Sequence, residues 1–240
     1  MSRVGKFTSS QIHRLMSKGR GNWSIENVGK PFESYVQEKV WESKLGRSID
    51  TESNAKQTSW GNLMELFFFE KHLDIRWTEV HKKRYEHPTL PWSGAPDMVS
   101  DTEVGDVKSP YTLRSFCEMS DMCAEAVIAH DTLKETKPDY YWQLVSNSIL
   151  TGIDDVSLYV HGVDEKYYND IVDYSEEMQD DLNSYAWIGF AKKEQLPLIP
   201  SGSKYPAITN ISFTVPTEEK ELLTERVKMA SELLNQKLGK

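Results

Sequence analysis

The chain has 240 residues, of which 38% are hydrophobic and 27% are charged. This length suffices for one sizeable α/β domain with its own core. The formal net charge of −9 argues against a protein that coats nucleic acid by bulk electrostatics. It still allows local contacts through metal ions and a few basic residues. The sequence lacks an apolar run of membrane-spanning length and a secretory signal pattern at its start, so we expect a cytoplasmic protein without membrane contact.

Helical and strand-like patterns alternate along the chain. Apolar spacing predicts helices that begin near Thr8 and Thr217 and others over 30–45, 58–73, 111–136 and 140–151, with one or two more in 164–191. Strands are expected at 75–80, 156–160 and 208–215, and loops at 46–57 and 195–206. In the helix over 30–45 we interpret Phe32, Val36, Val40 and Trp41 as a core stripe. The alternation indicates a single α/β domain over 1–240.

The segment 93–110 carries the strongest chemical signal, with the sequence S-G-A-P-D-M-V-S-D-T-E-V-G-D-V-K-S-P. It predicts a β-hairpin with its turn over 100–105. Side chains two apart on a strand share a face, so Asp106 and Lys108 point the same way while Val107 points into the core. Asp97 starts the facing strand and could stand close to Asp106. Two carboxylates and one ammonium would then meet at one spot.

A divalent metal ion would explain this arrangement. Neighbouring carboxylates repel each other unless a cation lies between them, and hard oxygen ligands favour Mg²⁺ or Mn²⁺ over zinc. A cation held by Asp97 and Asp106 would lower the pKa of a bound water and stabilise charge on a phosphate. Lys108 would orient that water or help to deprotonate it. The alternative is a solvated hairpin with ordinary surface charges, which is the commoner meaning of a lone D-x-K pattern.

Further candidates lie outside the hairpin. Arg3 and Ser10 flank a predicted helix start, where free N–H groups bind anions, although an ordinary capped helix explains them equally well. Glu65 lies one turn into an apolar helix, where it either faces solvent or joins the metal site. Gln143 lies near the amino end of the helix over 140–151 and could reach the carboxylates or a DNA phosphate. A helical glutamine is more often a surface residue.

Several of these segments resemble, in the same order, the PD-(D/E)XK nuclease superfamily and its phage recombination exonucleases, the lambda exonuclease or YqaJ-like group. The matching segments are R-V-G-K-F-T-S-S at 3–10, W-G-N-L-M-E at 60–65, A-P-D at 95–97, G-D-V-K at 105–108 and Y-W-Q-L at 141–144. The resemblance implies a restriction-endonuclease-like core with a mixed central β-sheet flanked by helices. It covers most of 1–160 and 207–240, and it leaves about 163–205 as an atypical insertion.

The resemblance implies a Mg²⁺-dependent deoxyribonuclease that degrades double-stranded DNA ends 5′→3′ in phage-type recombination and repair. Asp97 would bridge two Mg²⁺ or Mn²⁺ ions, Asp106 and the Val107 carbonyl would complete one of them, and Glu65 would support the other. Lys108 and Gln143 would place the attacking water. Arg3 and Ser10 would bind the 5′-phosphate of the DNA. A single-strand annealing protein as partner, a trimeric ring, and a phage or prophage gene in a bacterial host are also implied.

Two departures from the family pattern leave alternatives open. Asp106 stands where glutamate is usual, which shortens the reach of the carboxylate by one methylene. Ala95 stands where the phage enzymes can have a serine that helps to hold the phosphate. An endonuclease or nickase on the same fold is therefore a second hypothesis, and a non-catalytic DNA-binding protein is a third.

Overall fold

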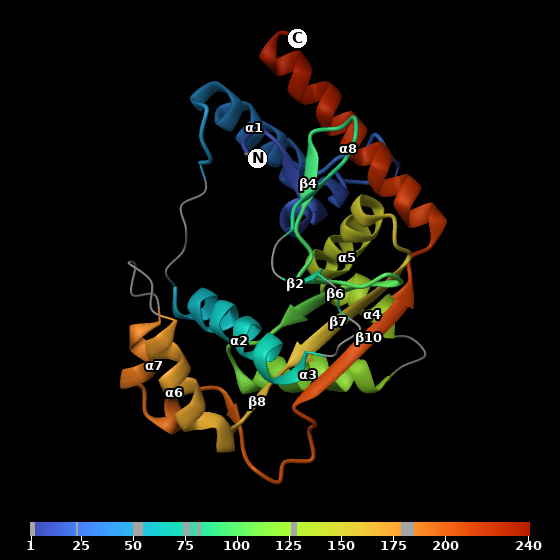
Figure 1. Ribbon diagram of the computed structural model, residues 1–240. Helices are drawn as coiled ribbons and strands as arrows, with labels where there is room; N and C mark the ends of the chain where they lie inside the picture. The colour runs from blue at the N-terminus through green and yellow to red at the C-terminus, as the bar shows by residue number, and fades with distance from the viewer. Residues whose placement is uncertain are drawn as a thin grey trace.

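The computed structural model describes residues 3–22, 24–49, 55–73, 77, 79–80, 83–125, 129–178 and 185–240. Within these ranges a mixed β-sheet lies between helices on both faces (Figure 1). The sheet has the order β10-β7-β6-β5-β2, with strands Ile208–Thr214, Asp155–His161, Glu103–Lys108, Met98–Val99 and Glu79–Val80. β6 and β7 run parallel, whereas the other neighbouring pairs are antiparallel. The predicted α/β class with a mixed, helix-flanked sheet is confirmed.

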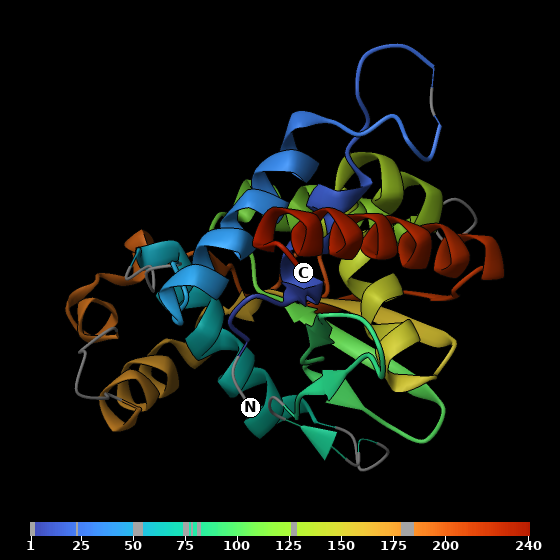
Figure 2. The same cartoon turned by 90° about the horizontal axis from the view of Figure 1, so that it is seen from above.

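One face of the sheet is covered by α3 (Leu113–Ala124), α4 (Ala129–Thr136) and α5 (Pro138–Thr151). Their apolar side chains form the main core with residues of β6, β7 and β10, including Val104, Leu158 and Ile211. The 3-10 helix η1 (Ser9–Met16) and α8 (Thr217–Leu238) pack against α5, and α1 (Lys30–Leu45) packs against η1 and α8. Figure 2 shows α8 crossing this side of the molecule next to α1. None of the described helices has the length and apolar character that a membrane span requires.

The opposite face of the sheet is covered by α2 (Lys56–His72). Phe68 and Phe69 pack toward the sheet, against Met98 and Val107. The other side of α2 packs against what we call the outer layer, residues 163–178 and 185–199. This layer contains β8 (Val163–Asp164), η2 (Glu165–Tyr167), α6 (Tyr168–Glu177), α7 (Ala186–Phe190), η3 (Lys193–Gln195) and β9 (Leu198–Ile199). As a result α2 is buried on two sides, between the sheet and the outer layer (Figure 1).

A small second sheet links the amino-terminal segment to the hairpin region. β1 (Phe7–Thr8) runs parallel to β4 (Trp92–Gly94), and β3 (Tyr85–Glu86) pairs antiparallel with β4 on its other side. Because β4 ends three residues before Asp97, this pairing brings the chain around Ser10 toward the predicted metal ligands.

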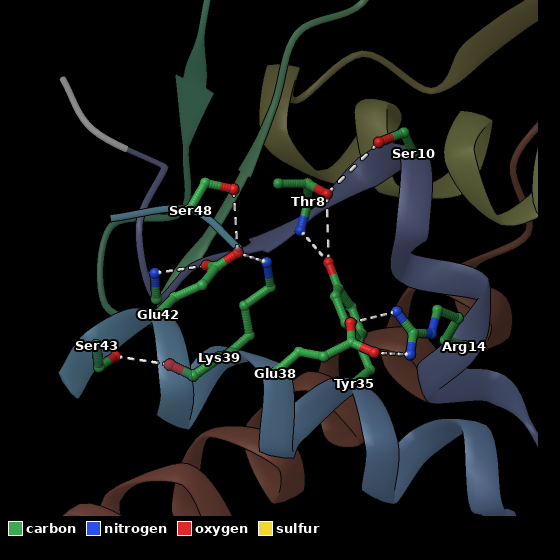
Figure 3. A network of polar contacts seen from close by, with 10 residues as sticks. Thr8, Ser10, Arg14, Tyr35, Glu38, Lys39, Glu42, Ser43 and Ser48 are labelled. Carbon is green, nitrogen blue, oxygen red and sulfur yellow. Dashed lines mark hydrogen bonds and ion pairs between the residues drawn. The ribbon is translucent and has the colours of Figure 1, made fainter. Parts of the chain in front are cut away.

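Polar contacts fix the amino-terminal segment to α1 (Figure 3). Glu42 accepts hydrogen bonds from the backbone N–H of Gly5 and from Lys39 Nζ, both at 3.0 Å, and both charged side chains are buried. The backbone N–H of Thr8 donates to the Tyr35 hydroxyl at 2.9 Å. Burial raises the pKa of Tyr35 to about 12, so this phenol remains protonated. Directional bonds of this kind hold residues 5–8 in a defined place on α1.

The burial of one residue and the extent of one helix differ from the sequence-based predictions. Trp41 is 50% exposed, because Phe32, Val36 and Val40 follow the four-residue spacing of the buried face and Trp41 lies about 100° further round the helix. The predicted helix over 111–136 is divided into α3 and α4, since Glu125 leaves the helical conformation. The helix expected near Thr8 is present as the 3-10 helix η1, with Thr8 as its N-cap.

Other differences are smaller. α2 begins at 56, inside the predicted loop over 46–57, and the predicted loop over 195–206 contains β9. Of the strand expected at 75–80, residues 77, 79 and 80 lie within the described part of the chain, and Glu79–Val80 form β2.

A buried group of hydroxyls joins α5 to η1 and β4. Ser146 Oγ lies 2.7 Å from Ser9 Oγ and accepts a hydrogen bond from Trp92 Nε1 at 2.9 Å, and all three side chains are buried. Ser148, two residues further along α5, is equally buried, but its hydroxyl has no hydrogen-bond partner among the described residues. The two serines therefore form a matched pair.

Ser146→Ala is expected to lower the free energy of unfolding by about 1–3 kcal/mol, because it leaves the buried indole N–H of Trp92 without an acceptor. Ser148→Ala removes the same atoms and should change it little or stabilise the protein, since no partner is left unpaired. Urea unfolding of both variants and the wild type checks this. Equal losses in the two variants would contradict the importance of the Trp92 bond.

Candidate active site

The predicted hairpin is formed by β5 and β6, in the register Met98 to Gly105 and Val99 to Val104. Its turn covers residues 100–102 and is shorter than predicted, because β6 already begins at Glu103. A side chain at Gly105 would place a Cβ only 2.6 Å from Met98 Cε, so glycine permits this close cross-strand contact. The hairpin therefore brings Asp97, which immediately precedes β5, alongside the carboxyl-terminal half of β6.

Asp106 is the centre of the site. It is 1% exposed, and Lys108 Nζ lies 2.5 Å from its Oδ2, as the shared strand face predicts. Its Oδ1 accepts a hydrogen bond from Gln143 Nε2 at 2.6 Å. One oxygen of this buried carboxylate thus accepts a hydrogen bond from α5, and the other forms an ion pair with a lysine of β6. The structure thus brings Asp106, Lys108 and Gln143 together.

The position of Gln143 follows from the sequence of α5. The helix starts at Pro138, two residues before the predicted start, and the missing N–H of proline is no loss in a first turn. It ends at Thr151, and Gly152 with φ +76° follows as the predicted stop. Leu144 and Val145 are fully buried in the main core and fix the rotation of the helix. This rotation points the Gln143 amide at Asp106.

Asp97 and Glu65 add two further carboxylates. Asp97 is partly buried, and its Oδ2 accepts a hydrogen bond from the backbone N–H of Val107 at 2.8 Å. Burial raises the pKa of Asp97 well above its usual range, and the charges of Asp106 and Glu65 raise it further, against the opposing effect of Lys108. Glu65, partly buried on α2, is therefore close enough to act on Asp97 electrostatically. Three carboxylates share one small region with the ammonium group of Lys108.

Lys108 is held in its charged form. Burial lowers its pKa, but the charges of Asp106 and Asp97 outweigh that effect, and the pKa lies above the ordinary lysine value. In this state the side chain is a cation that donates hydrogen bonds, and it cannot accept a proton from water.

A pocket of about 220 Å³ opens beside Lys108 and Glu65. Its wall includes polar residues of the first turns of α2 and of the segment after β6, namely Gln57, Thr58, Asn62 and Ser109, together with Tyr140. Lys108 Nζ lies 5.2 Å from the centre of the Tyr140 ring. Sequence reasoning missed Tyr140, although its position three residues before Gln143 places it on the same helical face.

The donor set fits a hard divalent cation. Asp97, Asp106 and Glu65 supply carboxylate oxygens, and their repulsion, visible in the raised pKa of Asp97, is what a cation would relieve. Among the described residues, no three His, Cys, Asp or Glu side chains are already arranged to hold a metal ion. The charge of Asp106 is offset by the Lys108 ammonium, and Gln143 donates a hydrogen bond to the same carboxylate.

Arg3 and Ser10 are both exposed. The Arg3 carbonyl accepts a hydrogen bond from the backbone N–H of Lys6 at 3.1 Å, and Ser10 Oγ lies 3.5 Å from Thr8 Oγ1 (Figure 3). Their guanidinium and hydroxyl groups are accessible to a ligand. Their role in binding a 5′-phosphate stays a prediction.

Solved structures of other proteins have a similar fold. An alkaline exonuclease, LHK-Exo, from Laribacter hongkongensis aligns with a TM-score of 0.60 at 15% identity over 99% of this chain and 91% of its own. LHK-Exo in complex with dAMP aligns with a TM-score of 0.55 at 15% identity, over 99% and 95%. A phage-related exonuclease from Haemophilus somnus 129PT aligns with a TM-score of 0.62 at 14% identity, over 98% and 95%.

No protein-family model and no curated protein matches the sequence. The structural likeness extends over nearly the full length of each chain, and it confirms the fold that the sequence resemblance implied. This chain shares the fold of these solved structures, a mixed β-sheet flanked by helices.

Proposed function

We propose that this chain is a divalent-metal-dependent DNA exonuclease of the PD-(D/E)XK type, a member of the phage recombination exonuclease group. The main observation behind the proposal is that the buried Asp106 carboxylate forms an ion pair with Lys108 and accepts a hydrogen bond from Gln143. The carboxylates of Asp97 and Glu65 lie close by. Burying a carboxylate near two others costs free energy, and an ordinary solvated hairpin would leave these groups in water. The likeness to alkaline and phage-related exonucleases supports the same function.

Asp97 and Asp106, with the Val107 carbonyl, would hold one cation, and Glu65 would support a second that Asp97 shares. Mg²⁺ is the first choice and Mn²⁺ the second, since all of these ligands are oxygens. When bound, such ions lower the pKa of a coordinated water and offset charge on the phosphate.

The protein's own groups would place the substrate. The Lys108 ammonium, which forms an ion pair with Asp106, would donate to the attacking water or to a phosphate oxygen. Gln143 would orient the same water or the scissile phosphate through its amide. Water would add to phosphorus and lose a proton to the solvent. The bond from phosphorus to the 3′-oxygen would break, the 3′-oxygen would take a proton from the solvent, and the product would retain its 5′-phosphate.

Finer features of the proposal come from the resemblance. They are 5′→3′ polarity on double-stranded ends, a trimeric ring, a single-strand annealing partner, and a phage or prophage role in recombination and repair within a bacterial cytoplasm. A single domain over 1–240 with an insertion at about 163–205 belongs with them. The dAMP complex of LHK-Exo supports DNA as the substrate class.

Digestion of linear, nicked and closed-circular DNA, each with and without Mg²⁺, tests the function. We expect linear DNA to be degraded only with Mg²⁺, and closed circles to stay intact because they offer no end. Cleavage of closed circles would favour the endonuclease or nickase hypothesis. Failure to cut any substrate with Mg²⁺ or Mn²⁺ would reject the nuclease proposal and favour a non-catalytic DNA-binding protein.

Arg3→Ala is expected to reduce the preference for 5′-phosphorylated over 5′-hydroxyl ends by about tenfold or more, the scale of a hydrogen bond to a charged group. Overall DNA binding should fall less. Arg20→Ala removes the same charge from another exposed position and serves as the control. Competition kinetics with the two kinds of end measure the ratio. A wild-type enzyme that treats both ends alike would refute the phosphate pocket.

A further inference from the structure

A buried histidine lies behind the site and has no part in the chemistry proposed above. His161 is the last residue of β7 and is 1% exposed. Its Nδ1 lies 3.2 Å from Ser109 Oγ, and its ring also hydrogen-bonds the backbone of Met64. Burial, with a smaller contribution from the neighbouring His72, lowers the pKa of His161 to about 3, so the imidazole is neutral at ordinary pH.

The two partners of His161 each adjoin a residue of the site. Ser109 follows Lys108, and Met64 precedes Glu65. The parallel register of β6 and β7 pairs Val160 with Lys108, which brings His161 next to Ser109. A neutral imidazole protonated at Nε2 satisfies both contacts, since it donates to the Met64 carbonyl and accepts from the Ser109 hydroxyl. One side chain thus connects α2 to the end of β6.

α2 packs on the sheet through apolar side chains, and on its other side Trp187 Nε1 of the outer layer donates a hydrogen bond to Ser59 Oγ at 2.9 Å. The side chains of α2 belong to two hydrophobic clusters that are separate from the main core. The Phe68 and His72 rings lie against the His161 ring, at 5.3 Å and 5.5 Å between centroids. Apolar contacts are non-directional and fix the spacing of α2 from the sheet, whereas hydrogen bonds fix its rotation and its position along the axis.

We propose that His161 is a positioning residue that holds α2 in the rotation at which Glu65 lies close to Asp97. The inference rests on the proposed metal-dependent nuclease function. It assigns His161 no contact with DNA or metal, and its effect passes through Glu65 alone.

A double-mutant cycle between His161 and Glu65 tests the inference. His161→Phe keeps a flat ring but removes both hydrogen bonds. His161→Gln retains a donor that can reach Met64, and it serves if the phenylalanine variant folds poorly. His72→Phe makes the same chemical change on the adjacent ring and is the control. Binding of Mg²⁺ without DNA is followed by titration calorimetry, and thermal unfolding monitors the fold.

His161→Phe is expected to weaken Mg²⁺ binding and to lower kcat by about 10- to 100-fold, the usual effect of losing a residue that orients a ligand. His161→Gln should lose less, and His72→Phe should bind Mg²⁺ like the wild type. In a Glu65→Gln background the His161 substitutions should have little further effect on either quantity.

Equal losses in the wild-type and Glu65→Gln backgrounds, or wild-type Mg²⁺ binding by folded His161→Phe, would overturn the inference and leave the nuclease proposal standing. A wild-type protein that binds no divalent cation and cuts no DNA would overturn both together.

Discussion

Asp106→Asn is expected to lower DNA cleavage by about 10²- to 10⁴-fold, the range seen when a group that acts on the reacting atoms is removed. The substitution preserves shape but removes the charge that lies between Lys108 and Gln143. A cation would lose one of its anionic ligands, and an amide nitrogen could face the Lys108 ammonium. Single-turnover cleavage of a linear duplex at saturating Mg²⁺ measures the effect.

Asp155→Asn is the matched control for this prediction. It makes the same change on the neighbouring strand β7, at an exposed carboxylate that accepts a hydrogen bond from Thr214 Oγ1 at 2.6 Å. It should leave cleavage unchanged. Lys108→Ala should lower cleavage by a similar factor to Asp106→Asn, and all three variants should show a folded circular dichroism spectrum. Wild-type cleavage rates in folded Asp106→Asn or Lys108→Ala would remove these residues from the mechanism.

The second large effect concerns stability and metal. Because the folded-state pKa of Asp97 is raised, its contribution to stability is complete below its ordinary pKa of about 3.9 and is lost as the pH rises through the folded value. Above that folded value the ionised Asp97 carboxylate opposes folding. A divalent cation should reverse this, by about 2.7 kcal/mol at 100 times its Kd, or about 5–10 °C in Tm for a chain of this size.

Asp97→Asn separates this effect from general salt effects. Asparagine can still accept the Val107 N–H, so the fold retains that bond. The variant should be more stable than the wild type without metal at pH 8, and its Tm should respond little to Mg²⁺. Thermal unfolding of both proteins from pH 5 to 8, with Mg²⁺ or an equal ionic strength of NaCl, measures the difference. The same Mg²⁺ shift in both proteins would show that the ion binds elsewhere.

Local spacing is enough to predict part of the site. The two-residue period of a strand sets Asp106 and Lys108 on one face, and a turn of polar residues between short apolar pairs brings Asp97 opposite. The end of α5 at Gly152 is also a local signal. For Glu65, helical spacing alone favours a side chain that faces solvent, and only the family resemblance favours a place at the candidate site. The effect of Glu65 on the pKa of Asp97 supports the place at the site.

The rest depends on pairing between distant segments. His161 can be connected with Ser109 only when the parallel register of β6 and β7 is known, and nothing in the sequence around β7 specifies that register. Trp41 is predicted as core when its hydrophobicity is given more weight than its angular position on the helix. Helices are predictable in the outer layer, but no local pattern shows that their partner is α2. Whether 163–205 is an insertion relative to the phage recombination exonucleases stays a prediction.

The burial of α2 on two sides has a consequence for protein engineering. Leu63 and Phe67 face the outer layer, yet they belong to the same rigid helix as Glu65. Resizing a side chain such as Ile171, which packs with them, would shift that helix without touching the pocket. Variant libraries aimed at this site should therefore include positions in the outer layer as well as those that line the pocket beside Lys108 and Glu65.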